Sequence, residues 1–589
     1  MVCMAAVNDP VHLDDAPPAR ATRHPGLGAD DPWWKAAVVY QVYPRSFADS
    51  NGDGIGDIPG IIDHLGHLED LGVDVVWLSP VYASPQDDNG YDISDYYAVD
   101  PSFGTLEDLH DLIAGLHARG MKLVMDLVVN HTSDEHDWFR QSASSRDDPK
   151  RDWYIWRDPR DGAEPNNWGS FFSGPAWTLD EATGQYYLHL FSKKQPDLNW
   201  ENPDVRAAIH RMMNWWLDRG VDGFRMDVIS FISKHPDLPD GPVPSEGAFG
   251  DGIELFGSGP RIHEFLQEMH REVFAGRDAD LVTVGEMVDA TPAKARLYTD
   301  PDRRELDMVF HFEHVGLDHG QGGRFSPRGY ELVELKRSFA GWQRELADVG
   351  WNSLYWNNHD QPRVVSRFGN DAEHWYTSAT ALATVLHLQR GTPYVYQGEE
   401  LGMRNMPFTA LEELRDIESL NHARVSALAG DGTLDPQVLA DIVRSGRDNA
   451  RTPMQWTGGR NAGFTEGEPW IRVNPDHASI NAEAQRADAA SVFAWYRRLI
   501  ELRHTEAVVI DGVFDLVAPD DPQLFAYTRT GERTALLVIA NCSDDPAAVP
   551  ADVRESWSGA ETVLANMPGE RMLPPTMAPW QTLVVRRSF

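Results

Sequence analysis

The chain has 589 residues and is strongly acidic, because 52 Lys and Arg stand against 91 Asp and Glu, a formal net charge of −39. With 42% hydrophobic residues it is long enough for a large core and more than one domain. The negative charge repels phosphate backbones and anionic lipids, so we expect no nucleic-acid partner and no membrane partner.

The first 32 residues are expected to form a disordered tail. Their beginning, MVCMAAVNDPVHLDDAPPAR, has no basic start and no long apolar stretch of the kind found in signal peptides. No apolar run approaches the roughly 20 residues of a membrane helix. The cysteines are Cys3 and Cys542 alone, which implies neither a disulfide framework nor a cysteine zinc site. We therefore expect a soluble, cytoplasmic protein.

From about residue 36, short apolar segments alternate with amphipathic segments. The expected strands cover residues 38–47, 75–80, 122–131, 223–228, 281–287, 308–313, 351–360 and 393–400. The clearest helical patterns between them cover residues 58–72, 105–120, 203–220 and 261–274. In two of these, Gly120 and Gly220 stand where a helix end leads into the next strand.

This alternation predicts an α/β fold with a closed, parallel (β/α)8 barrel, because each strand is almost continuously apolar. An open doubly wound sheet is the competing fold, but no G-x-G-x-x-G follows any of the strands. Residues 132–203 interrupt the rhythm and predict a subdomain inserted after the third strand. Segments 524–530, 534–541 and 581–589 predict a small C-terminal β-sandwich. The expected domains are a tail (1–32), the barrel (33–131 and 204–514), the inserted subdomain (132–203) and a β domain (515–589).

Polar residues end several of the expected strands on the same side. They are Asn130 and His131, Arg225 and Asp227, Glu286, and His359 and Asp360. The C-terminal ends of barrel strands meet at one face, where active sites are built. A single acid after a strand is usually a turn or cap residue, but such a convergence predicts a catalytic site. Arg225 and Asp227 point the same way in a strand, so the arginine is expected to keep Asp227 ionised as a nucleophile.

Four of these strand ends, DLVVNH, GFRMDV, VGEM and NNHD, resemble the four short regions of the α-amylase family of glycoside hydrolases. QPDLNW, DDNGYDISDY, QPRVVSRFGN and SRDNARTPMQW resemble its oligo-1,6-glucosidase branch, and the resemblance spans about residues 36–589. It implies Asp227 as the nucleophile, Glu286 as the general acid/base and Asp360 as the stabiliser of the transition state. It further implies sugar contacts in the innermost subsite, made by His131, Arg225 and His359.

Asp92 and Arg451 lie in two of these motifs, away from the strand ends. By themselves they are typical of a turn aspartate and a surface arginine. The resemblance implies that they pair, bind the non-reducing glucose and close the bottom of the pocket, which makes the enzyme exo-acting. Arg447, one helical turn earlier, is the alternative partner of Asp92.

Val228 follows the expected nucleophile directly. A β-branched residue in a strand ordinarily packs the barrel. The alternative is that Val228 contacts the second sugar, because in the resembling enzymes valine at this position accompanies α-1,6 preference. Alanine or threonine there accompanies α-1,4 or broader use.

The stretch DSNGDGIGD, residues 49–57, is similar to the first part of a calcium-binding loop. Its expected ligands are Asp49, Asn51, Asp53, the carbonyl of Ile55, and Asp57. The stretch departs from an EF-hand at Gly60, where a bidentate Glu would stand. The relatives that it resembles carry a cation here, so we expect a structural Ca²⁺, with Mg²⁺ as the alternative ion and a metal-free turn as the competing interpretation.

Together these features predict a retaining, exo-acting α-glucosidase that releases glucose from short α-glucosides and prefers α-1,6 linkages. Its partner is a small oligosaccharide, and the sequence leaves the oligomeric state open. One alternative is an isomerising or transglycosylating relative, such as a sucrose isomerase or trehalose synthase, although QPRVVSRFGN lacks the Arg-x-Asp-Arg-Asp run of sucrose isomerases. Another alternative is a non-catalytic, amylase-like binding protein.

Overall fold

The computed structural model describes residues 24, 27–28, 31–245, 248–277, 280–429, 433–569 and 572–589. Most of the expected N-terminal tail, including Cys3, therefore lies outside the described residues. Cys542 is described and is a buried free thiol.

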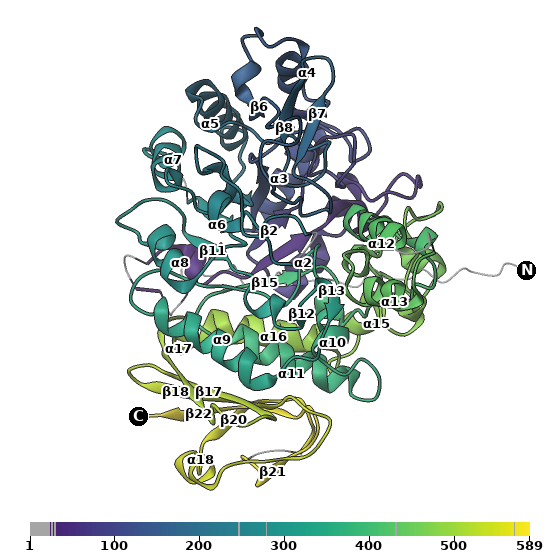
Figure 1. Cartoon of the computed structure of the whole chain (residues 1–589). Helices are drawn as coiled ribbons and strands as arrows, with labels where there is room; N and C mark the ends of the chain where they lie inside the picture. The colour runs from purple at the N-terminus through teal and green to yellow at the C-terminus, as the bar shows by residue number, and fades with distance from the viewer. Residues whose placement is uncertain are drawn as a thin grey trace, which may run out of the picture.

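Eight parallel strands form one sheet, in the order β11-β10-β9-β5-β2-β1-β15-β14 (Figure 1). Their bounds are β1 Val39–Val42, β2 Val75–Leu78, β5 Lys122–Val128, β9 Gly223–Asp227, β10 Val282–Glu286, β11 Met308–Phe310, β14 Ser353–Leu354 and β15 Thr392–Tyr396. Each strand pairs with the next in the chain, β15 pairs with β1, and a parallel bridge from Val309 to Asn352 joins the two ends of the sheet. The predicted (β/α)8 barrel is confirmed, and every barrel strand lies within its predicted segment.

The strands are apolar throughout because both of their faces are covered. One set of side chains, including Val75, Val124 and Met308, packs inside the barrel. Their neighbours in the sequence, such as Val76 and Leu123, belong to the larger core between the strands and the surrounding helices. Burial on both faces explains the runs that predicted a parallel sheet.

The helices after the first six barrel strands are α1 Ile58–Asp63, α2 Leu65–Leu71, α3 Leu106–Ala118, α5 Pro203–Leu217, α6 Ile253–Phe256, α7 Ile262–Met269, α8 Pro292–Thr299 and α9 Leu332–Glu345. Those that follow are α10 Val364–Arg367, α11 Trp375–His387, α12 Ile417–Ala429, α13 Pro436–Ser445, α14 Asp448–Arg451, α15 Ala482–Arg486, α16 Val492–Thr505 and α17 Ala507–Asp511. Gly120 (φ 70°) and Gly220 (φ 94°) adopt the left-handed backbone predicted for them after α3 and α5. The predicted helix 58–72 is divided in two at His64.

The segment between β5 and α5 forms a separate lobe, drawn at the top of Figure 1. It holds α4 Asp137–Ser144 and a three-stranded sheet of β6 Trp156–Arg157, β8 Gln185–Leu188 and β7 Trp177–Asp180. Two small hairpins lie elsewhere on the barrel loops, β3 Tyr82–Ala83 with β4 Asp95–Val99, and β12 His319–Gly320 with β13 Gly323–Pro327. The lobe packs beside the ends of β5 and β9, and so borders the face where the predicted site lies.

The C-terminal part is antiparallel and lies at the opposite end of the molecule from that lobe (Figure 1). Its main sheet contains β16 Val513–Val517, β17 Leu524–Thr530, β18 Thr534–Asn541, β22 Thr582–Ser588 and β20 Glu561–Ala565. A second pair is β19 Ala547–Ala548 with β21 Thr576–Met577, and α18 is Ala551–Ser556. Helix α9 packs against β16, and helix α11 against β18 and β22. The predicted β domain is thereby attached to the barrel through two barrel helices.

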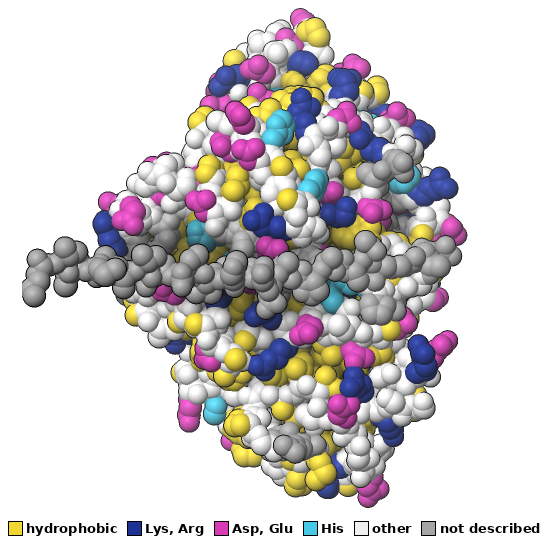
Figure 2. Space-filling view, turned by 180° about the vertical axis from the view of Figure 1, so that it is seen from behind, with side chains coloured by type: hydrophobic (Ala, Val, Ile, Leu, Met, Phe, Trp, Pro, Cys, Tyr) yellow, Lys and Arg dark blue, Asp and Glu magenta, His cyan; other side chains and the backbone are white. Residues whose placement is uncertain are grey.

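The surface carries charges of both signs. On the face shown in Figure 2, lysines and arginines alternate with aspartates and glutamates without gathering by sign. Among the described residues, no helix is long and apolar enough to cross a bilayer.

Candidate active site

A pocket of about 430 Å³ opens at the C-terminal end of the barrel strands and reaches the inserted lobe. It is lined by Asp88, Tyr91, His131, Phe171, Phe172, Phe191, Gln195, Asp227, Val228, Glu286, Val288, Phe312, Val315, Gly316, His319, Arg324, Asp360, Gln361, Glu418 and Arg447. The three predicted catalytic carboxylates, which are Asp227, Glu286 and Asp360, all line this one pocket. Its walls are largely aromatic and aliphatic, as in most small-molecule sites.

Arg225 organises the carboxylates behind the pocket. Its Nη1 donates to Asp227 Oδ1 and Asp126 Oδ1, both at 2.7 Å, and its Nη2 lies 2.7 Å from Glu286 Oε2. The alternation of side chains along β9 sends Arg225 and Asp227 to the same side, as predicted. One guanidinium therefore fixes the relative positions of Asp227 and Glu286.

The charges around Arg225 do not balance, since three carboxylates share one cation. Burial raises the pKa of Asp227 well above its ordinary value, and Glu286 adds to that rise, while Arg225 lowers the pKa. Burial likewise raises the pKa of Asp126 to about 6, against the effect of Arg225. The expectation that Arg225 alone keeps Asp227 ionised needs correction, because the cluster retains a proton that its members share.

The backbone after Asp227 has an unusual conformation. Val228 adopts φ 34° and ψ 42°, in the left-handed region that β-branched residues rarely enter. This turn directs the Val228 amide to Glu286 Oε2, at 3.1 Å. Because Oε2 is already held by Arg225 and Val228, the proton transferred to a substrate is best carried by Oε1. Val228 also lines the pocket with its side chain, as one of the two sequence interpretations expected.

Asp360 is held as an anion by its neighbours. Its Oδ1 lies 2.8 Å from Arg451 Nη2 and 3.4 Å from Arg447 Nη1, and its Oδ2 lies 3.4 Å from His359 Nε2. Burial opposes ionisation, but His359 and the two arginines lower the pKa of Asp360 well below its ordinary value. Burial also lowers the pKa of His359 to about 3. The imidazole is therefore neutral at pH 7, and the arginines supply the compensating charge.

The predicted sugar contacts are only partly in the pocket. His131 lines it, and burial lowers the pKa of His131 to about 4, so it is neutral and donates through Nε2 to the carbonyl of Tyr91 at 3.1 Å. Arg225 and His359 are 1% exposed and stand behind the described lining. Their expected direct contact with sugar is corrected to a supporting position, where each holds a catalytic carboxylate.

The expected pair of Asp92 and Arg451 is wrong in the described structure. The carboxylate of Asp92 turns into its own loop and accepts from the Ser84 hydroxyl and the amides of Asp87 and Asp88, at 2.9–3.0 Å. Arg451 binds Asp360 instead. Burial raises the pKa of Asp92 to about 7, which suits a loop-forming group better than an ion pair.

Asp88 and Arg447 form the pair that lines the pocket. Arg447 Nη2 lies 3.1 Å from Asp88 Oδ1, and both side chains are 6% exposed. Burial raises the pKa of Asp88 to about 6, although Arg447 lowers it. Arg447 also binds Asp416, at 2.5 Å, so its position is fixed from two sides. The sequence offered Arg447 as the alternative, whereas Asp88, four residues before Asp92 in DDNGYD, was missed.

The aromatic walls were also missed by sequence reasoning. Tyr91 stacks on His359 with ring centres 5.0 Å apart, and its hydroxyl donates to Asp126. Phe171 stacks on Phe191 at 5.2 Å, and the Arg447 guanidinium lies 4.9 Å from the centre of the Phe172 ring. The NNWGSFFSGPAW motif had drawn notice as aromatic, but only the fold shows which rings face the pocket.

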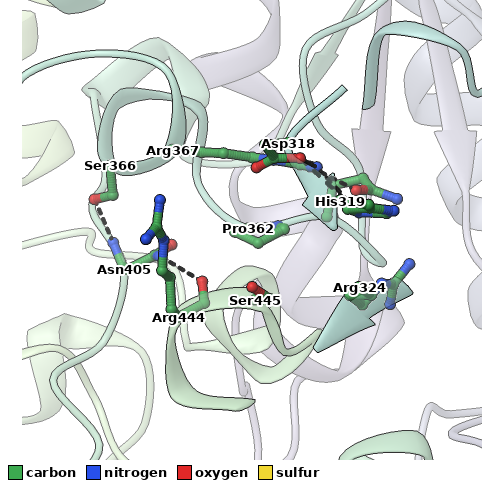
Figure 3. Close-up of a pocket in the computed structure, with 10 residues that line it drawn as sticks. Asp318, His319, Arg324, Pro362, Ser366, Arg367, Asn405, Arg444 and Ser445 are labelled. Atoms are coloured by element: carbon green, nitrogen blue, oxygen red, sulfur yellow. Dashed lines mark hydrogen bonds and ion pairs between the residues drawn. The ribbon is translucent and has the colours of Figure 1, made fainter. Parts of the chain in front are cut away.

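A much smaller pocket adjoins the main one and shares His319, Arg324 and Gln361 with it (Figure 3). Its volume of about 20 Å³ holds one or two water molecules. Arg367 is bound there by Asp318 through two contacts of 2.5 and 2.8 Å, and Arg324 is bound by Glu418 at 2.7 Å. We interpret it as a hydrated support for the rim of the main pocket.

The loop at 49–57 is folded by its own side chains. Asp49 accepts from the amides of Asn51, Gly52 and Gly54, and Asn51 and Asp53 each accept from the amide two residues later. Asp57 caps α1 through the amide of Gly60 at 2.7 Å. Oxygen ligands of the expected kind are thus gathered in one loop, far along the chain from the carboxylates of the pocket.

Comparison with known proteins places these features in context. The family model described as alpha amylase, catalytic domain, matches residues 41–512. An oligo-1,6-glucosidase from Parageobacillus thermoglucosidasius is 54% identical over 559 residues, which are 94% of this chain and 99% of that protein. The solved structure of trehalose-6-phosphate hydrolase from Bacillus licheniformis has a TM-score of 0.89 at 45% identity and covers 94% of this chain and 100% of its own. That of isomaltulose synthase from Klebsiella sp. LX3 has a TM-score of 0.90 at 40% identity, covering 95% and 100%.

Proposed function

The chain belongs to the α-amylase family of glycoside hydrolases, and from this premise we propose that it is a retaining, exo-acting α-glucosidase that prefers α-1,6-linked isomalto-oligosaccharides. The observation that carries the proposal is the pocket in which Asp227 and Glu286 bind the same guanidinium. The identity of 54% to an enzyme named oligo-1,6-glucosidase supports the choice of linkage.

In the proposed reaction, a carboxylate oxygen of Asp227 attacks C1 of the non-reducing glucose. The bond from C1 to the bridging oxygen breaks, and Glu286 gives its proton to that oxygen, so the shortened sugar leaves as an alcohol. Glu286, now a carboxylate, then takes a proton from water, which attacks C1 and frees Asp227. Each step inverts C1, so glucose leaves as the α-anomer.

The other charged groups fit this scheme. Asp360 is an anion, so it can bind the sugar hydroxyls and stabilise positive charge at C1 in the transition state. The Asp88–Arg447 pair lines the pocket and is almost completely buried, which suits recognition of a terminal glucose. A pocket that ends in such a pair admits chain ends, and this supports exo action.

We also propose a structural divalent cation, Ca²⁺ or Mg²⁺, in the loop at 49–57. The donor set of Asp49, Asn51, Asp53 and the Ile55 carbonyl is of the type that Ca²⁺ prefers. Asp57 already caps α1, and among the described residues the three loop aspartates do not form a compact carboxylate cluster. Binding would therefore require side-chain rotation in Asp53 or Asp57. A cytoplasmic location is proposed too, since a buried free thiol at Cys542 fits a reducing compartment.

Product analysis tests the activity. The purified protein is incubated with isomaltose, maltose, sucrose, trehalose and trehalose 6-phosphate, and the products are followed by NMR. We expect fastest turnover of isomaltose, with α-glucose as the first anomer. Rearranged disaccharides from sucrose or maltose would indicate an isomerase, faster turnover of the phosphorylated sugar would change the substrate class, and binding without turnover would contradict an enzyme.

A further inference from the structure

Two histidines and an aspartate meet at the end of the barrel opposite the active site. Asp74 stands just before β2 and accepts from the amide of Val38, just before β1, at 2.8 Å. His504 lies in the last turn of α16, and its Nε2 is 2.9 Å from Asp74 Oδ2. The ring of His24 stacks on His504 with centres 4.6 Å apart and planes 24° apart. Three distant segments thus bring metal-binding side chains to one place.

We propose that His24, Asp74 and His504 form a binding site for Zn²⁺ or a similar divalent transition metal. One ligand atom from each lies within 4.8 Å of the others, and this is the one such group found among the described residues. Two imidazoles and a carboxylate form a donor set that Zn²⁺ binds well, with water in the fourth position.

The local environment suits a cation ligand set. All three residues are half-buried, so they are shielded without being sealed from solvent. Burial lowers the pKa of His24, helped by the neighbouring His504, which leaves the ring neutral and able to coordinate. Zinc bonds of about 2.0–2.2 Å place ligand atoms roughly 3.3 Å apart. The 2.9 Å separation of His504 and Asp74 is already close to that value.

One nearby charge opposes binding. Arg503 precedes His504 in α16, but its guanidinium donates to the carbonyls of Ala36 and Lys35 and is fully buried. The site therefore holds one carboxylate and one neighbouring cation that is directed at the backbone. Affinity has to come chiefly from the two imidazoles, and this favours a transition metal over Ca²⁺ or Mg²⁺.

The expected role is structural. His24 precedes the part of the chain that matches the family model, residues 41–512, so family membership does not imply this site. An ion bound there would connect the N-terminal segment to the α2–β2 connection and to α16. Asp74 lies at the start of β2, whereas the catalytic carboxylates follow the opposite ends of the strands, so turnover should not depend on the ion.

The test uses the full-length protein without an affinity tag, stripped with EDTA and returned to buffer containing Ca²⁺ so that the loop at 49–57 is not the site titrated. ZnCl₂ is titrated by calorimetry, and CoCl₂ is added to record the visible bands of four-coordinate Co²⁺. The variants are His24→Ala and His504→Ala, with His110→Ala as the control, because His110 is an exposed histidine on α3. Melting curves with and without Zn²⁺, and kcat/KM on isomaltose, are measured on each.

We expect the wild type and His110→Ala to bind one Zn²⁺ and to melt at a higher temperature with it. His24→Ala should bind at least about tenfold more weakly, lose the Co²⁺ bands and keep its kcat/KM, because removing one ligand of three weakens coordination. Equal Zn²⁺ affinity in the wild type and His24→Ala would overturn the proposal. The absence of any Zn²⁺ binding by the wild type would overturn it as well, even if His504→Ala fails to fold.

Discussion

Single side chains decide the electrostatics of the pocket. Arg225 contacts Asp126, Asp227 and Glu286, so the carboxylate cluster carries more negative charge than its cation can balance. Asp360 is in the opposite situation, because two arginines approach one of its oxygens. Neighbouring carboxylates are therefore set to different protonation states, which is how acid and base roles are separated in one site.

The first prediction concerns the nucleophile. Asp227→Asn should lose at least about three powers of ten in kcat, because the amide cannot attack C1, while Arg225 can still bind its oxygen. Circular dichroism and the melting temperature check that the variant folds. Substantial turnover by a folded, pure variant would exclude this role.

The second prediction concerns the acid. Glu286→Gln should spare 4-nitrophenyl α-glucoside more than isomaltose, since a good leaving group needs little protonation. The ratio of kcat/KM for the two substrates, relative to wild type, is the measurement. Equal losses on both substrates would count against Glu286 as the proton donor.

The third prediction concerns Val228. Val228→Thr should raise kcat/KM for maltose relative to isomaltose by about tenfold, since threonine keeps the branched shape and adds a hydroxyl that can pair with a sugar hydroxyl. Val288→Thr makes the same change elsewhere in the pocket lining and serves as the matched control. An unchanged ratio in Val228→Thr, or a wild type that prefers maltose, would leave Val228 as a packing residue.

Elements position these side chains through the places where they end. The strands β9, β10 and β14 deliver Asp227, Glu286 and Asp360 to one mouth of the barrel, and the short helix α14 delivers Arg451. The segment after β15 is different, because Gly398 begins a single helical turn, Glu399–Leu401, whose acids are buried. Loops and single turns therefore carry most of the charged groups that the regular elements only aim.

The fourth prediction belongs to that turn. Burial raises the pKa of Glu399 to about 8 from 4.5, so the folded protein binds a proton that the unfolded chain releases. Its contribution to stability is complete below about pH 4.5 and is lost as the pH rises through 8. Glu399→Gln should therefore gain on the order of 1–3 kcal/mol relative to wild type between pH 5 and pH 9, because its amide still accepts from the Tyr496 hydroxyl.

The readout is the difference in melting temperature between variant and wild type as a function of pH. The exposed Glu483→Gln is the control, since it removes a carboxylate from the surface. A difference that stays constant from pH 5 to pH 9 would show that Glu399 has no raised pKa in the folded protein.

At the scale of the whole molecule, the barrel and the C-terminal sheet are joined by a buried lysine. Lys336 on α9 is fully buried, and its Nζ donates to the carbonyls of Ala518, Asp521 and Leu524, at 2.6–2.9 Å. An ammonium has three donors, so this group is completely satisfied at the junction. The loop that enters β17 is thereby fixed to a barrel helix.

The fifth prediction follows from this junction. Lys336→Met should lower the melting temperature by about 2–5 °C, because each buried carbonyl left without a donor costs about 1–3 kcal/mol. The initial rate on isomaltose at 25 °C should be unchanged. Arg337→Met on the same helix is the matched control, since it removes an exposed pair with Asp520 that contributes little. If both variants melt alike, Lys336 does not hold the domains together.

The sequence by itself determined the barrel, because continuous burial of eight strands and the helical periodicity between them are local patterns. It also placed Asp227, Glu286 and Asp360 together, since strand ends of a barrel share one face. What it could not decide was which of two nearby groups points into the pocket. Asp88 and Asp92 lie four residues apart in one loop, and backbone amides rather than spacing turn Asp92 inward. Arg447 and Arg451 share a helical face, and the positions of Asp88, Asp360 and Asp416 sort them into two different ion pairs. Such choices depend on contacts between segments hundreds of residues apart, which only the tertiary structure brings together.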